Sequence, residues 1–161
     1  KVSIIARGRA AGYTLKLPTE DKHMRSRSEF LAELSVLLGG YCAEKMVFKE
    51  LTTGAASDLS QASDLARDLV TRYGMSEKLG PITFGENEGL VFLGKEITEQ
   101  RNYSEKIAAE IDEEVNKFIR NAQKTAEKIL KQRKGKLNQI AKKLIEKETI
   151  EKEEFEKLMA L

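Results

Sequence analysis

The stretch SEFLAELSVLLGGYCAEKMVF, residues 28–48, decides the fold class of this chain. Its apolar residues recur at the spacing that places them on one face of a helix: Phe30, Leu34, Leu37, Leu38 and Tyr41. Ser28 is a suitable N-cap, because its hydroxyl can accept a hydrogen bond from a backbone N–H of the first turn. The pattern therefore predicts a helix from Ser28 to about Phe48 that buries one apolar face.

Two adjacent glycines, Gly39 and Gly40, lie inside this predicted helix. In a helix interior each glycine costs up to about 1 kcal/mol relative to alanine. We interpret the pair as a place where another backbone packs closely. The alternative is a kink or a break in the helix.

Helical patterns continue towards the C-terminus. One helix is predicted from about Asp58 to Tyr73, with Gly74 as the C′ residue that ends it. Residues 76–99 lack periodicity and are predicted to form a long loop with a short strand at 91–93. A long helix follows from Ser104 to about Gln132, and Gly135 is expected to break it. Two further helices are expected, one around Leu137 to Ile145 and a short last one that carries Phe155 and Leu158.

The N-terminal residues show a different period. Val2 to Ala6 and Gly12 to Leu17 read as two short strands, and Pro18 ends the second. We therefore predict a mainly α-helical, bundle-like domain with a small N-terminal β-strand pair. Its parts are the strand pair at 1–18, the helices and long loop at 28–99, and the C-terminal helices at 104–161.

Composition excludes several classes of protein. The chain has 161 residues, of which 40% are apolar and 34% charged, and its net charge of +2 favours no particular partner. No apolar run approaches the ~20 residues that cross a bilayer, and no signal peptide opens the chain. It starts with Lys1 rather than Met, which suggests a fragment. Cys42 is the only cysteine, so an internal disulfide is impossible, and we expect a buried, unreactive thiol.

Taken alone, the residues contain no complete active site. His23 is the only histidine and lies in a polar loop, so neither a Ser-His nor a Cys-His pair can form. Asp58, at the start of a helix, reads as an N-cap. The basic segment from Lys124 to Lys147 could bind nucleic acid. A solvated helix face is the interpretation we favour for it, because acidic residues flank the segment and no aromatic residues interleave.

Several motifs in order along the chain nevertheless resemble the peptidase domain of the FtsH family. The longest are TGAASDL at 53–59 and YGMSEKLGP at 73–81. Shorter ones are VSII at 2–5, RG at 7–8, GYT at 12–14, LGG at 38–40, AE at 43–44, VFLG at 91–94, YS at 103–104 and IDEEV at 111–115.

The resemblance implies a membrane-anchored homo-hexamer, on the cytoplasmic side of a bacterial inner membrane or the equivalent organelle membrane. An ATPase ring, using ATP and Mg²⁺, would feed membrane and soluble protein substrates to a zinc peptidase. Two zinc-binding histidines and the catalytic glutamate would come from a His-Glu-x-x-His helix, expected upstream of Lys1. The third zinc ligand of the family corresponds to Asp58. This chain by itself is therefore expected to be inactive, and nucleic acid is not an expected partner.

Further roles follow from this resemblance. Glu44 could hydrogen-bond a zinc-binding histidine. Gly39 and Gly40 would allow the zinc helix to approach closely. The strand with Val2, Ser3, Ile4 and Ile5 could provide an edge to which an extended substrate adds.

Without the zinc helix, apolar surface around Leu38–Gly40 and Leu65–Ala66 is expected to drive self-association. The alternative from another functional class is a non-catalytic helical interaction or scaffold module.

Overall fold

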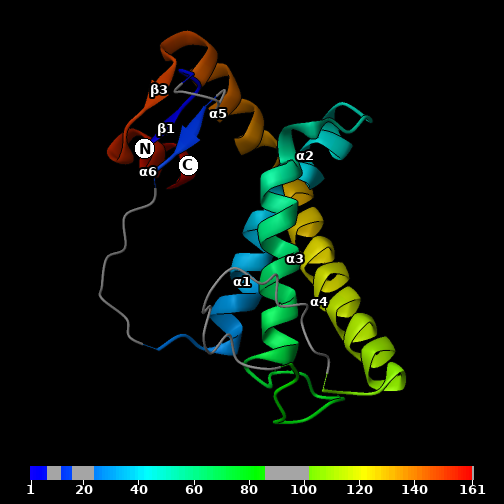
Figure 1. Cartoon of the computed structure of the whole chain (residues 1–161). Helices are drawn as coiled ribbons and strands as arrows, with labels where there is room; N and C mark the ends of the chain where they lie inside the picture. The colour runs from blue at the N-terminus through cyan, green and yellow to red at the C-terminus, as the bar shows by residue number, and fades with distance from the viewer. Residues whose placement is uncertain (7–11, 16–23, 86–101, 161) are drawn as a thin grey trace, which may run out of the picture. The chain divides into compact units, whose positions relative to one another are not determined.

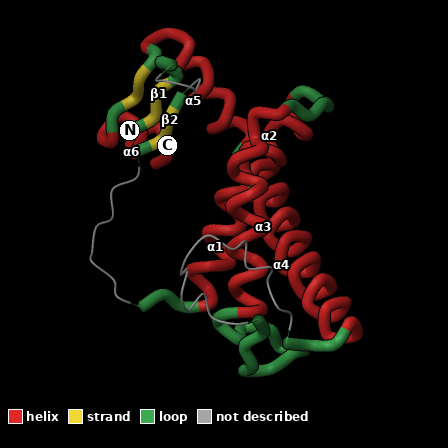
Figure 2. The backbone as a smooth tube through the Cα atoms, viewed as in Figure 1, coloured by secondary structure: helices red, strands yellow, loops and turns green. Residues whose placement is uncertain are grey.

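The computed structural model describes residues 1–6, 12–15, 24–85 and 102–160. The chain divides into two compact units: residues 25–128 form one, and residues 1–24 together with 129–161 form the other. Helices predominate, and the described strands all belong to the second unit (Figures 1 and 2). The predicted fold class, mainly α with a small sheet, is confirmed.

The helices of the 25–128 unit follow the predicted order (Figure 1). They are α1 (Arg27–Leu37), α2 (Gly39–Val47), the 3₁₀ turn η1 (Thr53–Ala55), α3 (Ala56–Thr71) and most of α4 (Glu105–Gln132). The start of α1 lies earlier than expected, because Ser26 rather than Ser28 is the N-cap. The Ser26 hydroxyl accepts from the backbone N–H of Glu29, whose carboxylate accepts from the backbone N–H of Ser26. This reciprocal capping box is a stronger start signal than a single hydroxyl.

The predicted single helix over residues 28–48 is two helices, so the alternative of a break is correct. Leu38 separates α1 from α2, although its N–H still donates to the Leu34 carbonyl at 3.1 Å. A Cβ added to Gly39 or Gly40 would meet nothing within 4 Å in the described structure. The close approach of a further helix to these glycines therefore stays a prediction.

The core of this unit consists of the apolar faces that the periodicity predicts. Leu34 of α1 and Leu69 of α3 are fully buried, and Ile111 and Phe118 of α4 are almost so. Helix α3 ends at Thr71 with Arg72 as its C-cap, earlier than predicted, so Gly74 is not the C′ residue, although its φ is positive at 58°.

The second unit joins the two ends of the chain. Its sheet has the order β2-β1-β3, where β1 is Val2–Ser3, β2 is Tyr13–Thr14 and β3 is Thr149–Ile150. Both pairings are antiparallel, with Val2 opposite Thr14 on one side and Ile150 on the other. The unit also contains α5 (Lys134–Lys147) and α6 (Lys152–Ala160).

Two expectations for this unit need correction. Gly135 does not break the long helix: α4 ends at Gln132, and Gly135 lies inside α5. Residues 2–5 do not form an open edge, because Val2 and Ser3 lie in the central strand, paired on both sides. The next two amides are also engaged, since Ile4 N–H donates to the Glu148 carbonyl at 2.9 Å and Ile5 N–H to Ser3 Oγ at 3.2 Å.

The surface expected around Leu38–Gly40 and Leu65–Ala66 is only partly exposed. Leu38 is 2% exposed and Ala66 is fully buried, whereas Gly40 is exposed and Gly39 and Leu65 are half-buried. Self-association through this surface stays a prediction. The exposed large apolar side chains among the described residues of this unit are Val36 on α1, Val47 at the end of α2, Phe48 and Leu51 after α2, and Tyr73 and Ile82 after α3.

Some predictions concern parts of the chain that are not described. His23, Pro18, Arg7–Gly8 and the short strand at 91–93 lie outside the described residues. Among the helices that are described, none is long and apolar enough to span a bilayer.

Candidate metal centre

Asp58 lies in the first turn of α3. The 3₁₀ turn η1 leads into this helix, and Ala55 occupies the N-cap position without a side-chain cap. Asp58 is therefore the third residue of the helix rather than its N-cap, and the N-cap interpretation is wrong. Its side chain is exposed, and within the described ranges it forms no hydrogen bond or ion pair. A carboxylate here is favoured by the partial positive charge of the helix N-terminus.

Glu44 of α2 holds the segment that leads to Asp58. One carboxylate oxygen accepts from the backbone N–H of Thr52 at 2.9 Å, and the other accepts from the Thr52 hydroxyl at 3.0 Å. The same hydroxyl accepts from the backbone N–H of Gly54 at 3.1 Å, which caps η1. We call these contacts between Glu44, Thr52 and Gly54 the Glu44 clamp. Its carboxylate fixes the start of η1, and through η1 the first turn of α3.

The clamp tolerates little extra bulk at its centre. A Cβ on Gly54 would lie 3.1 Å from Thr52 Oγ1 and 3.3 Å from Glu44 Oε1. A side chain at this position would therefore push against the two groups that hold η1. Thr52 and Glu44 would have to shift by a few tenths of an ångström to accept it.

The donor atoms present suit one metal ligand, but not a whole site. An exposed aspartate carboxylate is an acceptable protein ligand for zinc, which in catalytic sites takes three protein ligands and a water molecule. In the described part of the chain, no group of three or more His, Cys, Asp or Glu side chains could hold a metal ion. Asp58 fits the role of a single ligand whose partners come from other residues.

Cys42 matches the expected inert thiol. It is 1% exposed in α2, and its nearest polar contact is the Gln123 carbonyl of α4 at 3.9 Å. Burial raises the pKa of the thiol, and the charge of Glu127 raises the pKa further. A thiol that resists ionisation is neither a good nucleophile nor a good zinc ligand.

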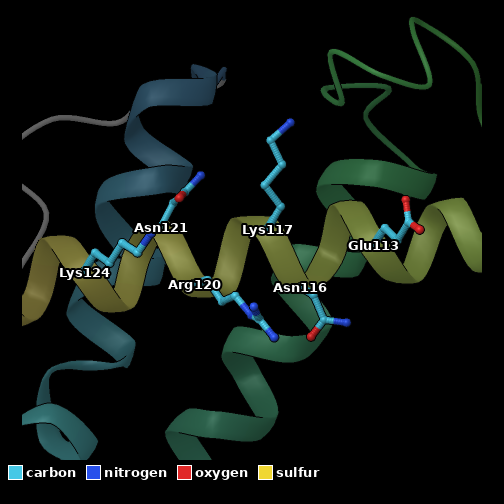
Figure 3. A pocket seen from close by; sticks show the side chains of 6 residues that line it. All are labelled: Glu113, Asn116, Lys117, Arg120, Asn121 and Lys124. Carbon is cyan, nitrogen blue, oxygen red and sulfur yellow. The ribbon is translucent and has the colours of Figure 1, made fainter.

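A shallow hollow of about 470 Å³ runs along the exposed side of α4, but it does not form a binding site. Its lining comes entirely from this helix: Glu113, Asn116, Lys117, Arg120, Asn121 and Lys124. Figure 3 shows these side chains fanning out to both sides of the helix rather than pointing at a common centre. Lys117 is also already paired with Glu114 at 3.1 Å. The surface is best described as a solvated helix face.

A buried polar contact that the sequence did not predict lies beyond the C-terminal end of α3. Glu114 of α4 is 4% exposed and accepts a hydrogen bond from the Ser76 hydroxyl at 2.7 Å. Burial of the carboxyl works to raise its pKa, but the hydrogen bonds from Ser76 and Lys117 outweigh it and the pKa of Glu114 lies below its ordinary value. A signal was available, since Glu114 stands three residues after Ile111 and four before Phe118, on the buried face of α4.

Comparison with known proteins gives a consistent result. The family model for peptidase family M41 matches residues 1–158. The chain is 54% identical over 159 residues to the ATP-dependent zinc metalloprotease FtsH of Caldicellulosiruptor bescii, covering 99% of this chain and 26% of that protein. Identity is 52% over 158 residues to FtsH 1 of a Thermoanaerobacter species, covering 98% of this chain and 26% of the relative. It is 49% over 161 residues to FtsH of Thermotoga maritima, with coverages of 99% and 26%. The chain thus spans about a quarter of the length of these relatives.

Proposed function

The chain belongs to peptidase family M41, and on this premise we propose that it is part of an ATP-dependent zinc endopeptidase to which it supplies Asp58 as a zinc ligand. The observation that carries the proposal is the state of Asp58. Its carboxylate is exposed at a helix start, has no partner within the described ranges and follows a segment fixed by the Glu44 clamp. A ligand held in place before the metal arrives needs little ordering when it binds.

The proposed division of labour follows from the contacts. Zinc, when bound, lowers the pKa of a bound water towards ~7 so that the water can attack a peptide carbonyl. Asp58 contributes a negatively charged oxygen to the metal. Glu44 acts on Asp58 through Thr52 and η1, which makes it a positioning residue for the ligand segment. A hydrogen bond from a zinc-binding histidine to Glu44 stays part of the proposal, because each carboxylate oxygen that accepts from Thr52 keeps a second lone pair.

The remaining groups would come from outside this chain. A His-Glu-x-x-His helix upstream of Lys1 would supply two histidines and the glutamate that takes a proton from the water. The open space beside Gly39 and Gly40 supports the packing of that helix against α2. The names of the relatives support an ATPase domain, which would bind ATP and Mg²⁺. Assembly as a homo-hexamer, attachment to a membrane on its cytoplasmic side and degradation of membrane and soluble proteins complete the proposal.

The decisive experiment is Asp58→Asn in the full-length protein. The amide keeps the shape of the carboxylate but loses its charge, so zinc should bind more weakly and degradation of an unfolded protein should fall at least about 100-fold. That is at or above the upper end of the roughly 10–100-fold loss typical of residues that hydrogen-bond to metal ligands. ATP hydrolysis should be unchanged. Asp64→Asn, at another exposed position of α3, is the matched control.

Near-normal degradation by Asp58→Asn would exclude Asp58 as an essential ligand. The isolated 161-residue chain offers a second test, since one ligand cannot hold zinc tightly. After dialysis it should carry no stoichiometric zinc and should not cleave casein. One zinc per chain with cleavage would contradict the proposal that the other ligands lie elsewhere.

A further inference from the structure

Thr52 lies where the chain passes from the loop after α2 into η1, and its hydroxyl forms two hydrogen bonds. The hydroxyl donates to Glu44 Oε1 at 3.0 Å and accepts from the backbone N–H of Gly54 at 3.1 Å. The backbone N–H of Thr52 donates to Glu44 Oε2 at 2.9 Å. A residue that only capped η1 would need no more than the bond from Gly54. Thr52 therefore does more than cap a turn, since it also joins η1 to a carboxylate on another helix.

The start of α3 depends on this connection. Ala55 is the N-cap of α3 and offers no side-chain hydrogen bond to the first turn. Its own side chain is 5% exposed and packs into the core, and the backbone N–H of Ala56 donates to the Thr53 carbonyl. The direction in which α3 begins is therefore set by η1. Thr52 and Glu44 hold the N-terminal end of η1 in place.

Asp58 depends on its backbone for its position. Its carboxylate is exposed, and in the parts of the chain that the structure describes no other group bonds to it. A metal ligand has to be held within roughly 0.5 Å of its productive position. Because no side chain orients Asp58, the placement of its carboxylate rests on the first turn of α3, and hence on the bonds that fix η1.

We propose that Thr52 is a positioning residue for the zinc ligand Asp58, and that the property required at this position is the hydroxyl. The inference rests on the proposed function of Asp58. The hydroxyl gives its one proton to Glu44, while a lone pair accepts the N–H of Gly54. It is therefore the link through which a carboxylate of α2 orients the first turn of α3.

Two substitutions separate this hydrogen bonding from packing. Valine keeps the shape of threonine but can neither donate nor accept, whereas serine keeps both abilities and loses only the methyl group. Because Thr52 is exposed, water can bond to Glu44 and to the N–H of Gly54 when the hydroxyl is removed. The fold of Thr52→Val should therefore be preserved, and its effect should appear at the metal.

The test measures the zinc affinity of the full-length protein by competition with a chelator of known affinity. Thr52→Val should weaken zinc binding about 10-fold, the lower end of the roughly 10–100-fold loss found for groups that orient metal ligands. Thr52→Ser should bind zinc nearly as tightly as the unsubstituted protein. Thr125→Val is the control and should leave the affinity unchanged, since the hydroxyl of this exposed threonine donates to the Asn121 carbonyl of its own helix.

A second measurement needs no zinc. Hydrogen exchange of the Gly54 amide in the zinc-free protein should be faster in Thr52→Val, because the amide loses its bond to the hydroxyl. In Thr52→Ser the exchange rate should stay close to that of the unsubstituted protein. Faster exchange and weaker zinc binding should therefore occur together in the valine variant and be absent from the serine variant.

Three results would overturn the inference. Unchanged zinc affinity in Thr52→Val would mean that the hydroxyl does not position the ligand, and faster exchange at Gly54 in that variant would then restrict it to capping η1. Equal losses of affinity in Thr52→Val and Thr52→Ser would assign the effect to packing. Normal zinc binding by Asp58→Asn would remove the ligand itself, and with it the proposed function. Loss of zinc in Asp58→Asn with normal affinity in Thr52→Val would refute the positioning role alone.

Discussion

The two units of this chain are assembled from sequence in opposite ways. The unit of residues 25–128 is one continuous stretch, and its core lies between helices that follow one another along the chain. The other unit combines both ends, and its central strand pairs with residues about 150 positions away. The continuous unit holds most of the buried apolar residues, whereas the discontinuous one buries mainly Leu144, Ile150 and Ser3. Asp58 and Glu44 both lie in the continuous unit.

This difference indicates which unit can hold a metal ligand rigidly in place. A metal ligand must be held within a fraction of an ångström, and packed helices do this better than a sheet of two-residue strands. The continuous unit is therefore the one suited to carry Asp58 and Glu44. Substitutions in each unit should show whether one unit can unfold while the other stays folded.

The largest effect is expected in the core of the continuous unit. Leu34→Ala removes a fully buried side chain from α1 and should lower the free energy of unfolding by about 3–5 kcal/mol, since it leaves a cavity among the helices. Chemical denaturation followed by circular dichroism measures this. Val36→Ala, on the exposed side of the same helix, should change it by less than about 0.5 kcal/mol. Equal effects at the two positions would contradict the assignment of the core.

A somewhat smaller and more local effect is expected from Ile150→Ala. Ile150 is fully buried in β3, and its truncation should cost about 2–4 kcal/mol. Hydrogen exchange should accelerate for the amides of Ser3 and Ile4 while the amides of α1 and α3 stay protected. Ile145→Ala, at a position 76% exposed in α5, is the control. Loss of protection throughout α1 and α3 would show that the units unfold as one.

Glu114 offers a test that depends on pH. Because its pKa is lowered in the folded state, the stability that it contributes is present above its unfolded pKa of ~4.3 and is lost as pH falls through the folded pKa. Glu114→Gln should cost about 1–3 kcal/mol near pH 7, since it weakens a hydrogen bond to a charged group. The difference from the unsubstituted protein should shrink below pH ~4. Glu113→Gln, at an exposed carboxylate on the same helix, should show no comparable loss. A difference that stays constant from pH 7 to pH 3 would refute the role of the charge.

The smallest effects concern one strained residue in each unit. Lys49 after the C-cap of α2 and Glu148 at the end of α5 both have φ of 60°. Glycine relieves this strain but also gains freedom in the unfolded chain, so Lys49→Gly and Glu148→Gly should each stabilise by only about 0.5 kcal/mol. Glu50→Gly, next to Lys49 but without a positive φ, should destabilise instead. Thermal unfolding of the three variants decides the matter, and stabilisation by Glu50→Gly would contradict the explanation.

The sequence predicted the helices well and their ends less well. The apolar faces of α1, α3 and α4 were readable because burial repeats with the period of the helix. The start of α1 at Ser26 could not be predicted, because Ser28 could equally provide the capping hydroxyl. The break at Leu38 could not be predicted either, because it depends on local backbone geometry. The third strand was missed because two residues, Thr149 and Ile150, carry no period of their own. Only the distant pairing with β1 defines it.

The residues alone did not identify the candidate metal centre. Asp58 became a candidate only through its family motif, because a single carboxylate near a helix start usually serves the helix. The clamp from Glu44 to Thr52 joins residues eight positions apart across a turn, which no periodicity reveals. The prediction that Val2–Ile5 form an open edge strand failed for the same reason. Whether a strand lies at an edge depends on a partner far along the chain.

The pairing of β1 with β3 has a consequence for biosynthesis. A ribosome adds roughly 5–20 residues per second, so β1 is synthesised roughly 7–30 s before its partner Thr149–Ile150. The unit of residues 25–128 is complete before β3 has been made. The nascent chain would therefore hold the segment that carries Asp58 while β1 still lacks its partner β3.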